Sequence, residues 1–265
     1  MTTAPQRITL VTGGNKGLGK ETVRRLIAEG HVVYLAARDA DRGRQAAREL
    51  GARPLVLDVT SDESVAAAAA VVQGEAGHLD VLVNNAAFVG ALDTAPAEVT
   101  AQQAQEVQGT NVIGLLRVTQ AFLALLEASA APVVVNVSSG MDSLGRTTDP
   151  AAMESRYPSL AYASSKAAVN MLTVQYAKSF PRLRVNAVDP RVHRHRRHRR
   201  DGQGCQRGRR GRRPHGARRS RRPDRNVHRQ RRASSVVSTW RELGEVRFIS
   251  LTSYRKSGAA VFTPV

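Results

Sequence analysis

Short apolar runs alternate with longer amphipathic stretches over the first 190 residues of this chain. The apolar runs are rich in β-branched residues, as buried strands are, and the amphipathic stretches repeat their apolar positions at helical spacing. We predict strands at 8–12, 32–36, 54–57, 81–83, 133–137 and 184–188, and helices at roughly 18–29, 41–50, 62–75, 111–128 and 159–180. Ser61 and Asp62 are candidate caps of the third helix. Strands separated by such helices predict an α/β fold with a doubly wound parallel sheet of the Rossmann type.

Both periodicities stop after Pro190. Residues 191–232 hold 19 Arg, 5 His and 2 acids, and their only apolar residues are Val192, Cys205, Ala217 and Val227. Such a segment cannot bury enough surface to offset its ordering entropy, so we expect the C-terminal region to be irregular or disordered. We therefore divide the chain into a dinucleotide-binding and catalytic domain (1–190), an Arg-rich segment (191–232) and an unassigned tail (233–265).

The strong positive charge belongs to one segment and not to the whole chain. The formal net charge is +18, and residues 191–232 carry +17 of it. The remainder has ordinary charge, so the composition does not indicate a nucleic-acid partner for the domain. The single cysteine, Cys205, excludes an intrachain disulfide and argues against a Cys-based metal site. We see no signal peptide and no apolar run approaching roughly 18 residues, which predicts a cytoplasmic protein without membrane contact.

A glycine-rich loop joins the first predicted strand to the first helix. It reads Thr-Gly-Gly-Asn-Lys-Gly-Leu-Gly from Thr12 to Gly19. Glycines let the backbone approach a pyrophosphate, and the helix N-terminus offers free N–H groups and a positive dipole end. The alternative is a simple tight turn. The candidate cofactor-binding residues here are Gly13, Asn15, Lys16, Gly17, Leu18 and Gly19.

The end of the second strand predicts which dinucleotide is bound. A carboxylate there would hold the ribose 2′-hydroxyl of NAD, but the strand leads into Arg38, and Lys16 lies in the glycine loop. Two cations favour a 2′-phosphate, hence NADP(H). A solvated surface charge is the alternative for Arg38. Asp58 and Val59 follow the third strand as candidate adenine contacts, with Asp58 placed to accept from the amino group or to cap a turn.

Tyr162 and Lys166 are candidates for proton transfer. The i, i+4 spacing places them on one helix face, one turn apart. A free tyrosine has a pKa of about 10, and a neighbouring ammonium would lower it towards neutrality. This spacing is common, and alone it is not specific.

Five motifs in order make the chain resemble the short-chain dehydrogenase/reductase family. They are the Thr-Gly-x-x-x-Gly-x-Gly loop, Asn84-Asn85-Ala86, Asn111, Ser139 and Tyr162-x-x-x-Lys166, over residues 7–190. The resemblance implies that Tyr162 is the general acid, that Lys166 lowers its pKa and binds the nicotinamide ribose, and that Ser139 holds the substrate oxygen. Ser138 is the alternative to Ser139. It further implies that Asn111 holds a water of the proton relay through its backbone, and that Asn84, Ala86 and Pro190 contact the cofactor.

The interval between Ser139 and Tyr162 is longer than is usual in this family. An insertion there, at 140–159, resembles the carbonyl reductase branch, and we expect it to cover the substrate mouth. The cations Lys16 and Arg38 also resemble that branch. The resemblance implies NADPH-dependent reduction of a ketone, aldehyde or quinone as the small-molecule substrate, with the substrate's identity and the oligomeric state left open.

The family pattern breaks at Arg191, which stands where a glycine should follow Asn186-x-x-x-Pro190. No threonine contact to the nicotinamide, substrate-binding helix or last strand is recognisable after it. Codons for 191–196 can be chosen so that reading one base later gives Gly-Tyr-Thr-Ala-Thr-Asp, which restores the pattern. Our hypothesis is a frameshift, which predicts impaired activity of this chain. The alternatives are an Arg-rich nucleic-acid-binding arm and a metal site at His193, His195 and His198.

Overall fold

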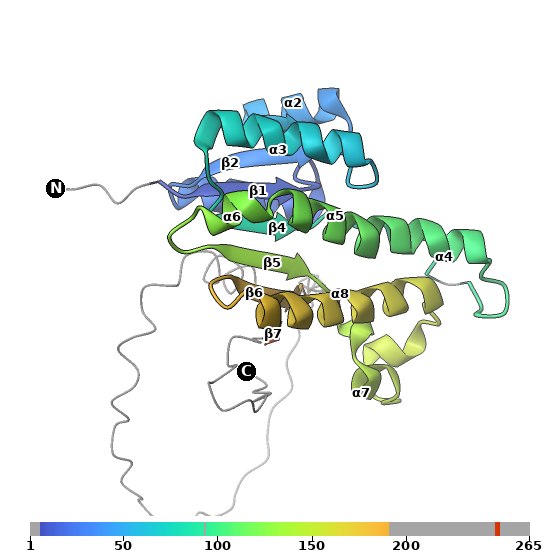
Figure 1. Cartoon of the computed structure of the whole chain (residues 1–265). Coiled ribbons are helices and arrows are strands. Elements are labelled where there is room, and N and C mark those ends of the chain that lie inside the picture. The colour runs from blue at the N-terminus through green and yellow to red at the C-terminus, as the bar shows by residue number, and fades with distance from the viewer. Residues whose placement is uncertain (1–5, 93, 191–246, 250–265) are drawn as a thin grey trace, which may run out of the picture.

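The structure, a computed structural model, describes residues 6–92, 94–190 and 247–249. Its centre is a sheet with helices on both faces (Figure 1). The parallel strands are β1 (Ile8–Thr12), β2 (Val32–Ala37), β3 (Arg53–Val56), β4 (Val81–Asn84), β5 (Val133–Val137) and β6 (Arg184–Asp189). The longest helices are α1 (Gly17–Ala28), α2 (Ala40–Leu50), α3 (Asp62–Ala76) and α8 (Leu160–Ser179).

The strand order is β3-β2-β1-β4-β5-β6-β7, which confirms the doubly wound sheet. The chain moves outward from β1 to β3 and then crosses back to β4, on the other side of β1. The connection that follows β1 therefore runs toward β2, and the connection that follows β4 runs toward β5, in the opposite direction along the sheet. This divergence opens the crevice in which such folds bind ligands, so the sheet places the site at the carboxyl edge next to β1 and β4.

Consecutive residues of each strand enter opposite cores, because side chains alternate across a sheet. Leu10 contributes to the core beneath α3, α5 (Gly114–Ala121), α6 (Leu123–Glu127) and α8. Its neighbour Val11 contributes to the core beneath α1 and α2. Burial on both faces explains why the strands read as unbroken apolar runs in the sequence.

Local chemistry fixes the ends of two helices on the β1–β3 side. The Asp39 carboxylate accepts from the Arg42 N–H at the start of α2, and the Ser61 hydroxyl accepts from the Ser64 N–H at the start of α3. Gly51 and Gly77 end the same helices in left-handed backbone conformation. Ser61 is thus the cap that the sequence predicts, while Asp62 is the first residue of the helix.

The helix predicted at 111–128 begins earlier and is not one regular helix. It starts with α4 (Ala101–Gln108), passes through the π turn η1 (Gly109–Ile113), and continues as α5 and α6. Thr100 and Gln103 form a capping box at its start. The sequence concealed α4 because Val107 is its one buried residue, so no apolar stripe marks it.

The expectation that no last strand follows Pro190 is wrong for three residues. β7 (Arg247–Ile249) pairs antiparallel with β6, with Val188 opposite Phe248. An outer strand exposes unpaired N–H and C=O groups that an extended segment can satisfy, and three residues are too short for a sequence pattern to reveal. The other predictions after Pro190, namely the disorder, the frameshift, the basic arm and the histidine site, lie outside the described residues.

Candidate active site

Tyr162 and Lys166 lie on successive turns of α8, as their spacing predicts. The ammonium nitrogen of Lys166 lies over the Tyr162 ring, 5.6 Å from its centroid. Lys166 is only 3 % exposed, and its Nζ donates to the Val137 carbonyl oxygen at 2.7 Å. Because Val137 ends β5, this bond ties the catalytic helix to the carboxyl edge of the sheet.

The structure brings Ser139, and not Ser138, to the tyrosine. The Ser139 side chain acts as the hydrogen-bonding group that lowers the pKa of the Tyr162 hydroxyl, and its oxygen accepts from the Met141 N–H at 3.3 Å. Ser138 is buried and turns the other way, donating to Asp142 Oδ2 at 2.6 Å. The two serines therefore have separate environments: Ser138 is bonded to Asp142, and Ser139 is the one that acts on Tyr162.

Burial controls the proton equilibria of this pair. It raises the pKa of Tyr162, and the negative charges of Asp189 and Asp142 raise it further, while the Ser139 hydrogen bond lowers it. Burial lowers the pKa of Lys166 to about 8, and Asp142 opposes that change. The pKa of Tyr162 is therefore raised overall, mainly by burial, with Asp189 and Asp142 adding to the effect. The predicted lowering of that pKa by Lys166 stays a prediction.

Asn111 holds the loop after β4 through its side chain. Its Oδ1 accepts from the Phe88 N–H at 2.7 Å, and its Nδ2 donates to the Phe88 carbonyl at 2.9 Å and to Ser165 Oγ at 2.9 Å. The π turn aims this side chain at both partners. Asn111 thus joins the loop to α8 next to Lys166, and its predicted role in a proton relay through the backbone stays a prediction.

The glycine loop forms a compact corner between β1 and α1. Gly13 and Gly17 have positive φ angles of 63° and 52°. A side chain on Gly19 would collide with the carbonyl oxygen of Gly13, so only glycine lets the helix start this close to the loop. Asn85 Nδ2 donates to the carbonyls of Thr12 and Gly13 at 2.9 and 3.2 Å, which fixes the corner to the end of β4.

Four other predicted cofactor residues surround this corner. Thr12 Oγ1 lies 3.0 Å from the Ala86 nitrogen and accepts its hydrogen. Lys16 is exposed and is the N-cap of α1, without a side-chain bond to the helix. Asn15 and Leu18 lie beside it, partly buried. The side chain of the N-cap residue therefore does not bond the first N–H groups of α1. A helix start of this kind can offer those N–H groups to an anion.

Arg38 is exposed directly after β2, and its charge acts on Asp58 and Asp39. The one acid beside it, Asp39, caps α2 and pairs with Arg42 at 3.4 Å, so it serves the helix. Asp58 Oδ1 accepts from Thr60 N and Thr60 Oγ1 at 2.9 and 2.7 Å, which is the turn role left open by the sequence. These bonds lower the pKa of Asp58.

Val59 and Asn84 contribute to packing in the described structure. Val59 is buried, and its carbonyl accepts from Arg117 Nη1 at 2.7 Å. Asn84 Nδ2 donates to Thr119 Oγ1 at 3.1 Å and to Asn136 Oδ1 at 2.9 Å, and Asn136 Nδ2 donates to Thr173 Oγ1 at 2.9 Å. This chain of buried side chains connects α5, β4, β5 and α8 beneath the site. Pro190 directly follows β6 at the same sheet edge.

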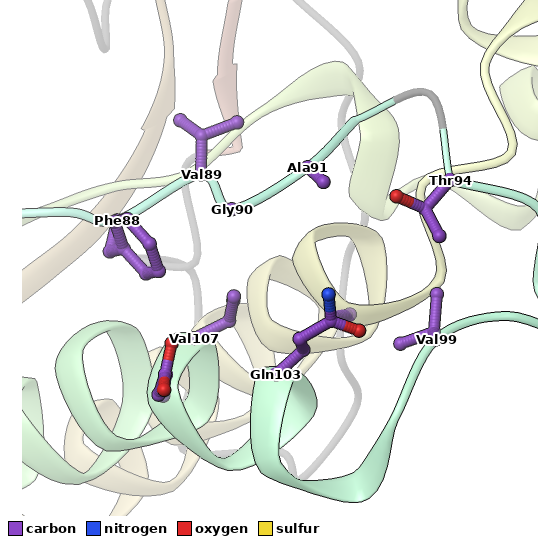
Figure 2. A pocket seen from close by; sticks show the side chains of 10 residues that line it. Phe88, Val89, Gly90, Ala91, Thr94, Val99, Gln103 and Val107 are labelled. Carbon is purple, nitrogen blue, oxygen red and sulfur yellow. The ribbon is translucent and has the colours of Figure 1, made fainter.

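A pocket of about 170 Å³ lies between the loop after β4 and the helix α4 (Figure 2). Ala161, the residue before Tyr162, lines it. Phe88 and Val107 supply apolar walls, and the Gln103 side chain lies between Val107 and Val99 (Figure 2). The insert at 140–159 forms the turn η2 (Gly140–Asp142), α7 (Leu144–Thr147) and η3 (Met153–Arg156) beside the same end of α8.

The sequence analysis missed Asp142, which contacts both serines. It also missed Asp189, whose Oδ2 would lie 3.2 Å from a side-chain carbon added to Gly140, and Asn170, which bonds Asp142. A signal existed for Asp142: Ser139-x-x-Asp142 is a capping-box pattern, and the box is present in η2. No local pattern marks Asp189 and Asn170, because β6 and α8 bring them to the site from afar.

Known proteins resemble this chain in sequence and fold. A family model described as short chain dehydrogenase matches residues 7–195. A short-chain dehydrogenase/reductase of Aspergillus fumigatus is 39% identical over 177 residues, covering 63% of this chain and 66% of that protein. The (-)-isopiperitenone reductase of Mentha piperita is 31% identical over 262 residues, covering 70% of this chain and 83% of that protein. The solved structure of salutaridine reductase from Papaver somniferum has a TM-score of 0.61 and 28% identity, covering 70% of this chain and 86% of that chain.

Proposed function

The chain belongs to the short-chain dehydrogenase/reductase family of oxidoreductases, and from that premise we propose that it reduces a ketone, aldehyde or quinone to an alcohol with NADPH. The observation that carries the proposal is the cluster of the partly buried Ser139 and Tyr162 with the buried Lys166 at the carboxyl edge of the sheet. A paired hydroxyl and phenol can hold one carbonyl oxygen, and the phenol can protonate it.

The nicotinamide cofactor, when bound, supplies the hydride that adds to the carbonyl carbon. Tyr162 donates the proton to the carbonyl oxygen, and Ser139 donates a hydrogen bond that stabilises the charge developing there. Hydride and proton together convert the carbonyl to an alcohol. Because burial and two carboxylates raise its pKa, Tyr162 is protonated near neutral pH, which suits a proton donor in reduction better than a base in oxidation.

The residues of the glycine corner fit a dinucleotide. The loop approaches closely at Gly13 and Gly19, and the uncapped start of α1 offers N–H groups to a pyrophosphate. We assign the 2′-phosphate to Arg38 and Lys16, since the neighbouring acid Asp39 caps α2. We assign Asn15, Gly17, Leu18, Asp58, Val59, Asn84, Ala86, Asn111 and Pro190 to the surroundings of the cofactor and the proton relay.

The pocket beside Ala161 supports a substrate with an apolar body. Its walls include Phe88, Val99 and Val107, with the Gln103 amide as a polar contact. Two of the similar proteins are reductases by name, which supports the reductive direction.

A cofactor-consumption assay tests the proposal. The full chain should consume NADPH, measured as loss of reduced-nicotinamide absorbance, in the presence of a quinone, an aliphatic aldehyde or a cyclic ketone. Consumption no faster than that of the Tyr162→Phe variant, with every carbonyl, would overturn the proposed function.

The cofactor preference is tested with Arg38→Asp. Hydrogen bonds to charged groups contribute about 1.5–3 kcal/mol, so the NADPH-to-NADH ratio of kcat/KM should fall by roughly tenfold or more. Arg48→Asp, the same charge change at an exposed position in the last turn of α2, is the control and should leave the ratio unchanged. An equal ratio in all three proteins would refute the NADP(H) assignment.

A further inference from the structure

Asp142 is one of two carboxyl-bearing residues whose charge raises the pKa of the proposed proton donor, Tyr162. Asp142 belongs to the turn η2, which packs against α8. Its Oδ2 accepts from Ser138 Oγ at 2.6 Å and from the Ser139 N–H at 3.5 Å. Burial raises the pKa of this carboxyl group, while hydrogen bonding by the Ser138 and Asn170 side chains opposes that rise in pKa. Asp142 therefore connects the end of β5 to the catalytic helix.

The position of Asn170 makes this connection specific to the active face of α8. Tyr162, Lys166 and Asn170 follow each other at intervals of four residues, so they lie on one face of the helix on successive turns. Ser138 Oγ also lies 3.4 Å from the Lys166 carbonyl oxygen. Ser138 Oγ therefore lies between the Asp142 carboxylate and the main chain of α8 at Lys166.

The charged and titratable side chains near Asp142 come from α8, β6, η3 and α7. Lys166 is buried and Tyr162 is half-buried, both on α8. Asp142 faces them from η2, and Asp189 faces them from the end of β6. Glu154 of η3 and Arg146 of α7 pair with each other at 2.8 Å and lie against Gly140, next to Asp189. Asp142 acts on both Tyr162 and Lys166, while the effect of Asp189 is on Tyr162.

We propose that Asp142 is a positioning residue of this active site: its carboxylate holds the Ser138-Ser139 turn against α8 and supplies the negative charge that balances the buried ammonium of Lys166. The role in turnover rests on the proposed function, whereas the charge balance is a property of the folded chain. A buried ammonium is costly unless it is compensated, and the Val137 carbonyl is a dipole without net charge. Asp142 supplies the missing charge.

The first experiment measures the pKa of Lys166 and does not require enzymatic turnover. The chain has five lysines, so labelling them with 13C at Cε gives few signals, and the signal lost in Lys166→Arg identifies Lys166. Removing the negative charge in Asp142→Asn should lower the pKa of Lys166 below its value of about 8, by about half a pH unit or more. Asp142→Glu should retain the higher pKa, and Asp149→Asn, an exposed acid of the same insert, should leave it unchanged. An unchanged Lys166 titration in Asp142→Asn would overturn the charge balance.

The pH profile of kcat/KM is the second readout. Loss of a nearby negative charge lowers the pKa of both Tyr162 and Lys166, and reduction needs both protonated. The alkaline limb of Asp142→Asn should therefore move to lower pH, while Ser138→Ala, which loses the bond but keeps the charge, should lose rate without moving the limb. A uniform loss of rate with no movement of the limb would show that Asp142 only shapes the turn.

An inactive wild-type chain and an unfolded Asp142→Asn variant each have a defined interpretation. If the wild-type chain consumes no NADPH, the proposed function fails, and the Lys166 titration still decides the charge balance. If Asp142→Asn does not fold, as judged by thermal unfolding, Asp142→Ser replaces it. It removes the same charge while keeping a hydroxyl, and the expected shift of Lys166 is the same.

Discussion

The carboxyl end of β1 and the carboxyl end of β5 lie at the same sheet edge but are built differently. The β1 corner depends on main-chain shape: glycines at Gly13, Gly17 and Gly19, and an uncapped helix start. The β5 corner depends on side chains that come from η2 and α8, namely Ser139, Asp142 and Lys166. The comparison teaches that a phosphate needs backbone N–H groups at close range, whereas proton transfer needs side chains held by distant elements.

The largest expected effect is on the β5 corner, and it should be confined to activity. Tyr162→Phe removes the proposed acid, and general acid catalysis contributes about a hundredfold to ten thousandfold, so kcat/KM should fall by that factor. The lost hydrogen bond to Ser139 should change the free energy of unfolding by no more than about 1.5 kcal/mol. Steady-state kinetics and urea unfolding measure the two effects. A variant that keeps most of the wild-type rate would place the proton donor elsewhere.

The next effect concerns the β1 corner, where the path of the backbone matters for both folding and cofactor binding. Gly19→Ala forces a methyl group against the Gly13 carbonyl and within 2.5 Å of Asn85 Nδ2. Overpacking of this kind costs about 1–3 kcal/mol, and we expect weaker NADPH binding as well. Urea unfolding and a fluorescence titration with NADPH measure both. Gly74→Ala is the control: it lies in α3 with open space around it, and alanine should stabilise by about 0.5–1 kcal/mol. Equal effects of the two substitutions would contradict the account of Gly19.

A smaller effect tests the network of buried polar side chains beneath the β5 corner. Asn136 is completely buried and joins Asn84 to Thr173. Asn136→Ala leaves buried polar partners unpaired, which should destabilise the protein by about 2 kcal/mol. Urea unfolding measures it, and the double variant with Thr173→Val should lose less than the sum of the two single variants. Strict additivity would indicate that the residues do not act as one network.

The smallest effect belongs to a local cap on the β1 side. Ser61→Ala removes the acceptor for the Ser64 N–H and should cost about 1 kcal/mol. Because the cap acts within one turn of α3, the KM for NADPH should stay at the wild-type value. A change in KM larger than that caused by Arg48→Asp would show that local caps on this side also shape the cofactor site.

The same contrast explains what the sequence could predict. The doubly wound parallel sheet, the glycine loop and the Tyr162–Lys166 spacing depend on periodicity and local geometry, and the structure contains all three. The choice between Ser138 and Ser139 could not be derived locally, because it depends on Asp142 drawing Ser138 away from Tyr162. The direction of the Tyr162 pKa was also out of reach, because it is set by burial and by Asp189 on another strand.

Two elements escaped prediction for physical reasons of a different kind. α4 is polar on most of its surface, and its start is marked only by the Thr100–Gln103 capping box. β7 is held by backbone pairing with β6, and such pairing leaves little trace in three residues. The helix prediction at 111–128 failed at its start because an apolar pattern finds buried faces and not exposed ones. Roles assigned to cofactor residues stay predictions until the assays above are done.

The π turn at Gly109–Ile113 has a consequence for how this chain tolerates insertions and deletions. A π turn is in effect one surplus residue inside a helix, and a regular helix rotates by about 100° per residue. Deleting one residue there would let α4 and α5 run on as an ordinary helix, while every side chain on one side of the deletion would be turned by that angle. Asn111 would then point away from Phe88, or Val118 away from the core. This segment should therefore accept substitutions far more readily than any change in its length.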